Sequence, residues 1–242
     1  MKVFLVFIFS TISIIGFTKE KSDSTRYPLQ VSGAASLNSN GIAPVPSFAL
    51  GKPAITLNLT LKKRWFSYDP QFSYGLDFRP WIMDNWFHFR IIDKTKFELR
   101  TGFNISTFFS EYQTPAQFVW HGQKYGTLEL AGIYKFSPTS SIGLMGWYDK
   151  GFDTGTVTGY FIDVAYDKTD VPIGKHLLFA VNVQLFYIDY TGNSDGFFVS
   201  PKLALTARKL PLSIFFQGIQ ALSTNITPFP EFQWNIGVGY AF

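Results

Sequence analysis

The chain has 242 residues, which suits one all-β domain and leaves no room for a second. Aromatic residues make up 19% and charged residues 16%, whereas a soluble domain usually carries about 25% charge. The net charge of +4 is small and its Lys and Arg are scattered, which argues against nucleic acid as a partner, and the lack of cysteine excludes disulfides, thiolate metal sites and cysteine nucleophiles.

The first residues predict export. Lys2 precedes an apolar run over residues 3–17, and polarity rises at residues 19–21. The run is short for a spanning helix, so we expect a cleaved Sec-type signal peptide at 1–18; a retained anchor is the alternative. We expect a short periplasmic segment at 19–27 and an outer-membrane β-barrel over 28–242. Beyond residue 18 no stretch of 18 uncharged apolar residues occurs, so membrane insertion would require a barrel.

Strict alternation of apolar and polar residues repeats along the mature chain. It is clear from Phe66 to Arg79 and clearest from Glu231 to Phe242, where one face is apolar and the other small or polar. Several runs keep phase for ten or more residues, which exceeds the usual 5–6 of globular strands and suits a tilted transmembrane strand. The pattern therefore predicts an all-β fold, a closed up-and-down antiparallel barrel of about 12 strands.

The strands are expected near residues 28–37, 53–62, 66–79, 85–92, 96–109, 127–136, 141–150, 156–166, 176–189, 196–207, 211–222 and 231–242. A bulge is expected where phase breaks at Phe215 and Phe216. With the N- and C-termini in the periplasm, turns there fall at 62–64, 93–96, 137–140, 167–175 and 207–209. The two longest connections, 38–52 and 110–126, would then be external, as is typical of outer-membrane barrels.

In this pattern the chain resembles bacterial outer-membrane β-barrel proteins as a broad class. The C-terminal signature carries most of the resemblance, with Val238, Tyr240 and Phe242 at alternate positions. The resemblance implies a location in the bacterial outer membrane, contact with its lipid and lipopolysaccharide, and recognition of the final strand by the barrel-assembly machinery. It identifies no subfamily.

Aromatic residues near the predicted strand ends suit interfacial girdles, where the ring contacts lipid and the polar tip faces headgroups. They are Trp65, Trp81, Trp86, Trp120, Tyr148, Tyr160, Tyr166, Tyr187 and Tyr190.

Ionisable residues predicted to face the lumen nearly cancel in charge. The acids are Asp69, Asp77, Glu98, Glu129, Asp149, Asp163 and Glu231, and the bases are Lys62, Arg79, Arg90, Arg100, Lys135 and Lys202. A balanced set favours a cross-strand network that holds the barrel together over a selectivity ring of one sign.

Five large apolar residues also project inward by the same count: Phe108, Trp147, Phe186, Ile188 and Phe198. They suggest an apolar vestibule at the external end, above a charged waist. It would receive a partly apolar small molecule or seat an inward-folded loop, and the connection 110–126 is a candidate for that loop. The alternative is that bulges shift the phase and these side chains face lipid.

Signals for chemistry are weak. His88, His121 and His176 lack a nearby serine at the spacing of barrel lipases, and no metal-ligand cluster or phosphate loop occurs, so no catalytic, metal or cofactor site is expected. A lipid-modifying enzyme centred on His88 remains a minor alternative.

The sequence favours a porin-like transport protein, a narrow or gated channel for small solutes, because twelve strands enclose more space than eight. The alternative is a non-conducting structural or accessory barrel that belongs to an envelope protein complex.

Overall fold

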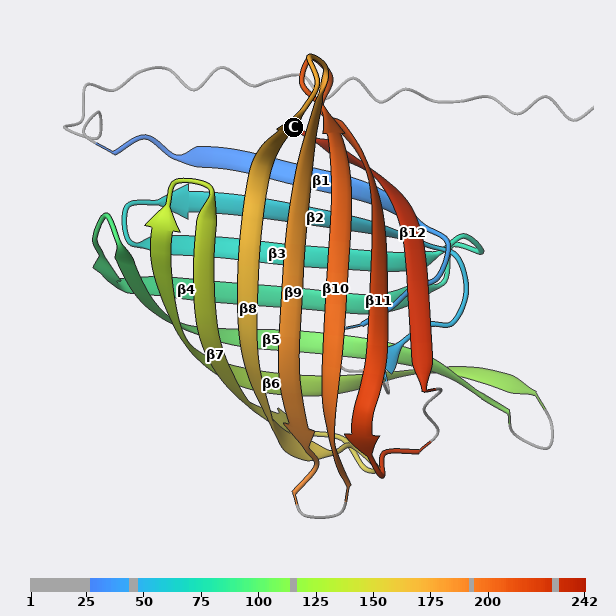
Figure 1. Ribbon diagram of the computed structural model, residues 1–242. Helices are drawn as coiled ribbons and strands as arrows, with labels where there is room; N and C mark the ends of the chain where they lie inside the picture. The colour runs from blue at the N-terminus through green and yellow to red at the C-terminus, as the bar shows by residue number, and fades with distance from the viewer. Residues whose placement is uncertain (1–26, 44–47, 114–116, 192–193, 228–230) are drawn as a thin grey trace, which may run out of the picture.

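The computed structural model describes residues 27–43, 48–113, 117–191, 194–227 and 231–242. The expected signal peptide and most of segment 19–27 lie outside these residues. Twelve antiparallel strands form a closed barrel in which each strand pairs with its neighbours in sequence and the last pairs with the first (Figure 1). The strands are β1 Gln30–Asn38, β2 Ala54–Lys63, β3 Phe66–Gly75, β4 Pro80–Asp93, β5 Phe97–Gln113, β6 Phe118–Ser137, β7 Ser140–Gly151, β8 Thr158–Ile173, β9 Leu177–Asp189, β10 Asp195–Ala207, β11 Leu212–Thr224 and β12 Phe232–Ala241.

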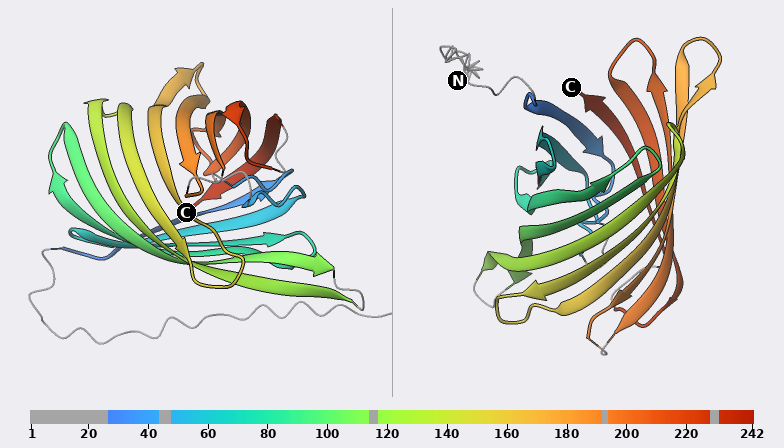
Figure 2. Two further views of the ribbon diagram at one scale, coloured as in Figure 1. Left: turned by 90° about the horizontal axis from the view of Figure 1, so that it is seen from below. Right: turned by 90° about the vertical axis from the view of Figure 1, so that its left-hand side faces the viewer.

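The predicted closed barrel of twelve strands is confirmed. The strands are strongly tilted, so that opposite walls of the barrel cross one another (Figures 1 and 2). No helix in the described part of the chain is long and apolar enough to cross a membrane.

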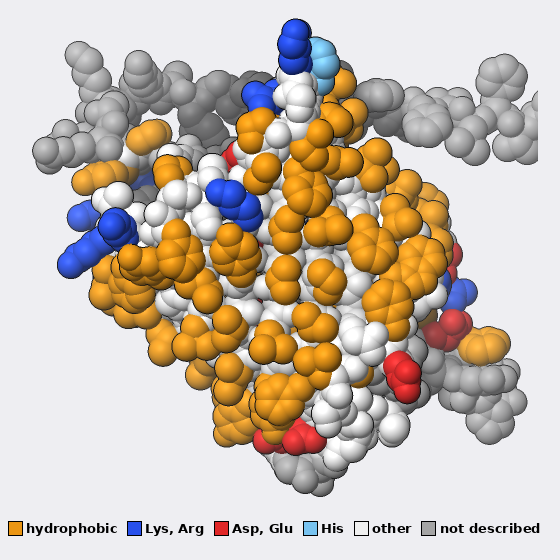
Figure 3. All heavy atoms as spheres, viewed as in Figure 1, with side chains coloured by type: hydrophobic (Ala, Val, Ile, Leu, Met, Phe, Trp, Pro, Cys, Tyr) orange, Lys and Arg blue, Asp and Glu red, His pale blue; other side chains and the backbone are white. Residues whose placement is uncertain are grey.

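Side-chain alternation determines which face each residue occupies. In β12, Trp234, Ile236 and Val238 are each about half exposed on the outer surface, whereas Asn235 is 3% exposed inside. Hydrophobic side chains cover most of the outer face formed by β8 to β12 (Figure 3). An apolar outer surface with polar residues inside is the reverse of a soluble protein and suits a wall surrounded by lipid.

The barrel closes where the first and last strands meet. Backbone hydrogen bonds join Gly33 and Phe242 in both directions at 2.8 and 2.9 Å. The ring of Phe242 lies over Gly33, and a Cβ atom at Gly33 would come within 2.6 Å of that ring and 2.9 Å of the Asn58 carbonyl oxygen. Glycine at this position therefore permits the close approach that seals the ring.

The two ends of the barrel differ in the length of their connections. At one end they hold two to four residues, and at the other four to fifteen, the longest being 39–53 between β1 and β2. Both described chain ends, the start of β1 and the end of β12, lie at the end with short connections.

Several expected boundaries were wrong. The strand expected over 66–79 ends at Gly75 and turns back at Pro80, because residues 76–79 form a tight turn with Phe78 at a φ of 60°. Most of the expected loop 110–126 is strand, and the β5–β6 hairpin projects beyond its neighbours (Figure 1). Most of the expected turn 167–175 is likewise strand, since β8 continues to Ile173.

The bulge expected at Phe215 and Phe216 lies elsewhere. Phe215 is buried inside and Phe216 faces outward, so phase holds there. Phe197 pairs with Ser223 and Phe198 with Ala221, which leaves Leu222 without a partner in the ladder. The irregularity is therefore near the end of β11.

Candidate functional site in the barrel lumen

The connection between β1 and β2 folds into the barrel. Its two arms pair through Gly41 N–H to the Lys52 carbonyl (2.9 Å) and Leu50 N–H to the Gly41 carbonyl (2.7 Å). The indole Nε1 of Trp81 donates a hydrogen bond of 2.8 Å to the carbonyl of Phe48. This anchor fixes the described part of the connection, residues 39–43 and 48–53, against the start of β4. We call these residues the inward loop.

The inward loop packs against two apolar clusters on the barrel wall. On one side Ile42 contacts a buried cluster formed by Phe161, Phe186, Ile188, Phe198, Ile219 and Ile226. On the other side Phe48 lies 4.6 Å from Phe108 and 5.5 Å from Tyr125 between ring centroids. The five residues of the expected vestibule are thus inside the barrel, but Phe108 belongs to a different cluster from Phe186, Ile188 and Phe198. The segment that packs over them is the inward loop. In the described part of 110–126, the ring of Phe118 is exposed.

Aromatic rings form a continuous arc along the inner wall. Its members are Trp86, Trp147, Phe161, Phe186 and Phe198, from β4, β7, β8, β9 and β10. Successive ring centroids lie 5.2, 4.7, 5.3 and 5.2 Å apart. These distances are typical of favourable aromatic contacts. We call this feature the aromatic arc.

Glu129 joins this arc to the charged residues below it. Its carboxylate accepts hydrogen bonds from Arg100 Nε (3.0 Å) and Trp147 Nε1 (2.9 Å), and His88 Nε2 lies 3.5 Å away. Only 4% of Glu129 is exposed, so these three partners take the place of water around a buried carboxylate.

His88 is held between two carboxylates. Its Nδ1 lies 2.7 Å from Asp69 Oδ2, and the Ser67 hydroxyl donates to the same oxygen at 2.6 Å. A catalytic serine would instead hydrogen bond to the histidine ring. Ser67 and His88 are therefore positioned as two donors to Asp69, and not as a nucleophile and its base.

Other predicted network residues pair locally or lie outside the lumen. Lys135 pairs with Glu98 (3.4 Å), and Arg90 pairs with Asp93 (2.6 Å). Asp77 and Arg79 were wrongly expected in the lumen, because the chain turns before them. They lie exposed in the β3–β4 turn, where Asp77 pairs with Lys52 and Arg79 with Glu111.

Five of the residues predicted for the network form no ion pair within the described chain: Lys62, Asp149, Asp163, Lys202 and Glu231. Asp163 and Lys202 are the two whose surroundings are clearest. Asp163 is 3% exposed, and its Oδ1 has no hydrogen-bond partner among the described residues. Lys202 lies with its Nζ 4.6 Å above the ring of Phe215. Neither forms an ion pair there, so the expected cross-strand charge network does not extend to the part of the lumen that they occupy.

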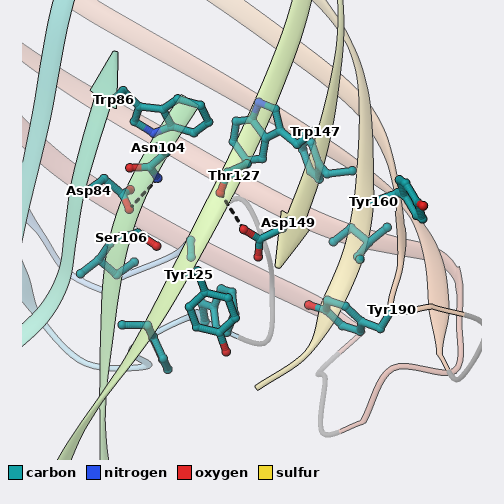
Figure 4. Close-up of a pocket in the computed structure, with 17 residues that line it drawn as sticks. Asp84, Trp86, Asn104, Ser106, Tyr125, Thr127, Trp147, Asp149, Tyr160 and Tyr190 are labelled. Carbon is teal, nitrogen blue, oxygen red and sulfur yellow. Dashed lines mark hydrogen bonds between the residues drawn. The ribbon is translucent and has the colours of Figure 1, made fainter. Parts of the chain in front are cut away.

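The lumen contains a cavity of about 610 Å³, far more than one water molecule needs. Uncharged amides and hydroxyls outnumber charged groups in its lining: Ser36, Asn38, Thr56, Asn58, Gln71, Thr169, Asn182, Gln184, Gln217 and Asn235, against Asp84, Asp167 and Lys202. A smaller pocket of about 110 Å³ adjoins it, and Asp84, Trp86 and Trp147 line both. We call this smaller pocket the upper pocket. In this upper pocket Asp84 projects from β4 and Asp149 from β7 (Figure 4).

No protein-family model matches the chain. No curated protein matches it in sequence. Solved structures do match. The KdgM porin in complex with disordered oligogalacturonate has a TM-score of 0.58 and 12% identity, covering 87% of this chain and 99% of that one. The COG4313 outer membrane channel from Pseudomonas putida F1 has a TM-score of 0.52 and 10% identity, covering 93% and 100%. The NanC porin has a TM-score of 0.50 and 10% identity, covering 87% and 99%.

This is the fold of an outer-membrane β-barrel. The similarity confirms the resemblance seen in the strand pattern, and at these identities it concerns the fold alone. Val238, Tyr240 and Phe242 are all about half exposed, on the outer face of the closing strand or directly after it. Their role as an assembly signal stays a prediction.

Sequence reasoning missed several residues of the site in this barrel. Trp81 and Trp86 were assigned to the interfacial girdle, yet both face inward. The alternation along β4 could have placed Trp86 correctly. It lies four residues before Arg90, which was predicted to face the lumen, and residues an even number apart on a strand share a face. The same rule places Phe161 inward with Asp163. No comparable signal exists for Ile42 and Phe48, which lie in a loop.

Proposed function

We propose that the protein is a narrow channel for small solutes in the bacterial outer membrane. The observation that carries the proposal is the polar cavity of about 610 Å³ inside a closed ring of strands. Eight-stranded barrels are filled by their own side chains, whereas twelve strands leave space. The matched structures include proteins described as porins and as an outer membrane channel, which supports this reading.

We infer the orientation of the barrel in the membrane from the lengths of the connections at its two ends. We place both termini and the short connections at the periplasmic side, and the inward loop at the external side, as in other outer-membrane barrels. Solutes would then enter past the inward loop and the aromatic arc before they reach the charged residues around Glu129.

Planar bilayer recording tests the channel. Purified protein should give small, discrete conductance steps. The variant Ile42→Ser/Phe48→Ser should give larger steps, because it removes the two side chains that seat the inward loop on the wall. The matched control is Phe118→Ser, which changes an exposed ring on the β5–β6 hairpin and should leave the steps unchanged.

Complete absence of conductance from correctly folded protein would contradict the proposal. A stable co-purifying envelope partner together with that absence would favour the alternative of a structural or accessory barrel.

A further inference from the structure

The upper pocket combines aromatic walls with two carboxylates. Its aromatic lining includes Trp86 and Trp147 of the aromatic arc, with Tyr125 opposite them (Figure 4). Phe108 also lines it. Asp84 and Asp149 enter from different strands. No Lys or Arg side chain contributes to this lining among the residues that the structure describes.

Each carboxylate is held by a neutral donor. Asn104 Nδ2 donates to Asp84 Oδ1 at 3.2 Å, and the Thr127 hydroxyl donates to Asp149 Oδ1 at 2.6 Å. Neither acid forms an ion pair in the described part of the chain, whereas Glu129, Glu98 and Asp69 each have a cationic residue or a histidine within 4 Å. The charges that looked balanced when counted along the sequence are therefore segregated in space, with unpaired acids around the upper pocket.

A pocket of this composition suits a positively charged guest. Aromatic faces attract cations through their quadrupoles, and desolvated carboxylates are stabilised by an opposite charge. An anion would face two like charges, and a neutral solute would leave both uncompensated. From this geometry we infer that the upper pocket binds small organic ammonium ions and makes the channel selective for cations.

The inferred cation selectivity rests on the proposed channel function and deepens it. The inferred binding of ammonium ions in the upper pocket does not depend on conduction. The larger cavity agrees with it, since its lining holds two acids, Asp84 and Asp167, against one base, Lys202. Asp163, two residues from Phe161 of the aromatic arc, adds a further buried acid, and its Oδ1 has no hydrogen-bond partner among the described residues.

The test uses choline as the probe and 3,3-dimethylbutan-1-ol as its neutral analogue, in which carbon replaces the charged nitrogen. Calorimetric titration of the detergent-solubilised barrel should show saturable binding of choline and none of the analogue. Asp84→Asn/Asp149→Asn should weaken choline binding by about tenfold or more, because the counter-charge is lost. The matched control Asp93→Asn/Glu111→Gln removes two charges outside the pocket and should bind choline like the parent.

In bilayers with a potassium chloride gradient, the reversal potential should show preference for cations, and the Asp84→Asn/Asp149→Asn variant should reduce it. Conductance without cation preference and without choline binding would overturn this inference and leave the proposed channel intact. Binding of choline by a barrel that never conducts would support the site and refute the channel. Equal binding of choline and its neutral analogue would show a merely apolar pocket and overturn the inference.

Discussion

The indole Nε1 of Trp147 donates a hydrogen bond of 2.9 Å to Oε2 of Glu129, its cross-strand partner on β6. This bond joins the aromatic arc to Arg100 and His88 through one nearly buried carboxylate. The stacking of the arc and the pairing of the charges are therefore parts of the same wall.

Glu129→Ala should destabilise the barrel, because it leaves Arg100 and the Trp147 N–H without their acceptor. The expected loss is about 1–3 kcal/mol, the usual cost of an unsatisfied buried group. Urea unfolding of the refolded barrel in detergent measures it. Glu111→Gln, which removes an exposed acid that pairs with Arg79 at the barrel rim, is the control and should change stability by less than about 0.5 kcal/mol. Equal stabilities of the Glu129→Ala variant and the parent would show that the carboxylate is not a structural centre.

Closure of the ring depends on the space above Gly33. Gly33→Val should lower the folded yield and cost about 1–3 kcal/mol, because its side chain would overlap the Phe242 ring and the Asn58 carbonyl. Gly146→Val is the matched control, since a Cβ atom there meets nothing within 4 Å. Heat-modified mobility in gels reports the folded fraction of each variant. If the two valine variants fold equally well, the tight contact at the seam is unimportant.

The strand pattern predicted the barrel because a strand in contact with lipid needs apolar side chains at every second position. β12 shows this best, with Trp234, Ile236 and Val238 outside and Asn235 inside. The same parity placed Glu129, Arg100 and Phe186 correctly, because a strand has only two faces.

Other parts of the site have no such rule. The inward loop has no periodicity, so the packing of Phe48 beside Phe108 could not be read from the sequence. Counting acids and bases along the sequence suggested that the charges of the lumen balance one another. Which charges actually pair depends on which strands are neighbours and on their register, and a count contains neither. Only the fold shows that Glu129 has partners whereas Asp84 and Asp149 have no ion pair among the described residues.

Trp81 fixes the inward loop through its N–H group. Trp81→Phe keeps a large ring but removes the donor to the Phe48 carbonyl, which should weaken the anchor by about 0.5–1.5 kcal/mol. In bilayers this variant should show more frequent fluctuations between conductance levels. Trp65→Phe, at an exposed position in the β2–β3 connection, should behave like the parent. Identical current noise in all three proteins would mean that this hydrogen bond does not hold the loop.

Acid should break the ion pair between Lys52, near the end of the inward loop, and Asp77 in the β3–β4 turn. The hydrogen bond from Lys52 holds the pKa of Asp77 below its ordinary value of 3.8, with smaller contributions from the Arg79 N–H and the two positive charges. The ion pair is therefore complete above that ordinary value and is lost as pH falls through the lowered pKa. Lys52→Gln should return the pKa toward 3.8, as carbon-13 NMR titration of the Asp77 carboxyl would show. An unchanged pKa in this variant would contradict the pairing.

The most direct test of the channel uses the absence of cysteine from the chain. Gln184 lines the large cavity, and the next residue, Leu185, is 48% exposed on the outer face of the same strand. Each is changed to cysteine in turn, and a water-soluble, membrane-impermeant methanethiosulfonate reagent is added during single-channel recording. We expect the conductance of Gln184→Cys to fall in one step and that of Leu185→Cys to stay constant. A constant conductance in Gln184→Cys despite labelling confirmed by mass spectrometry would contradict conduction through this lumen.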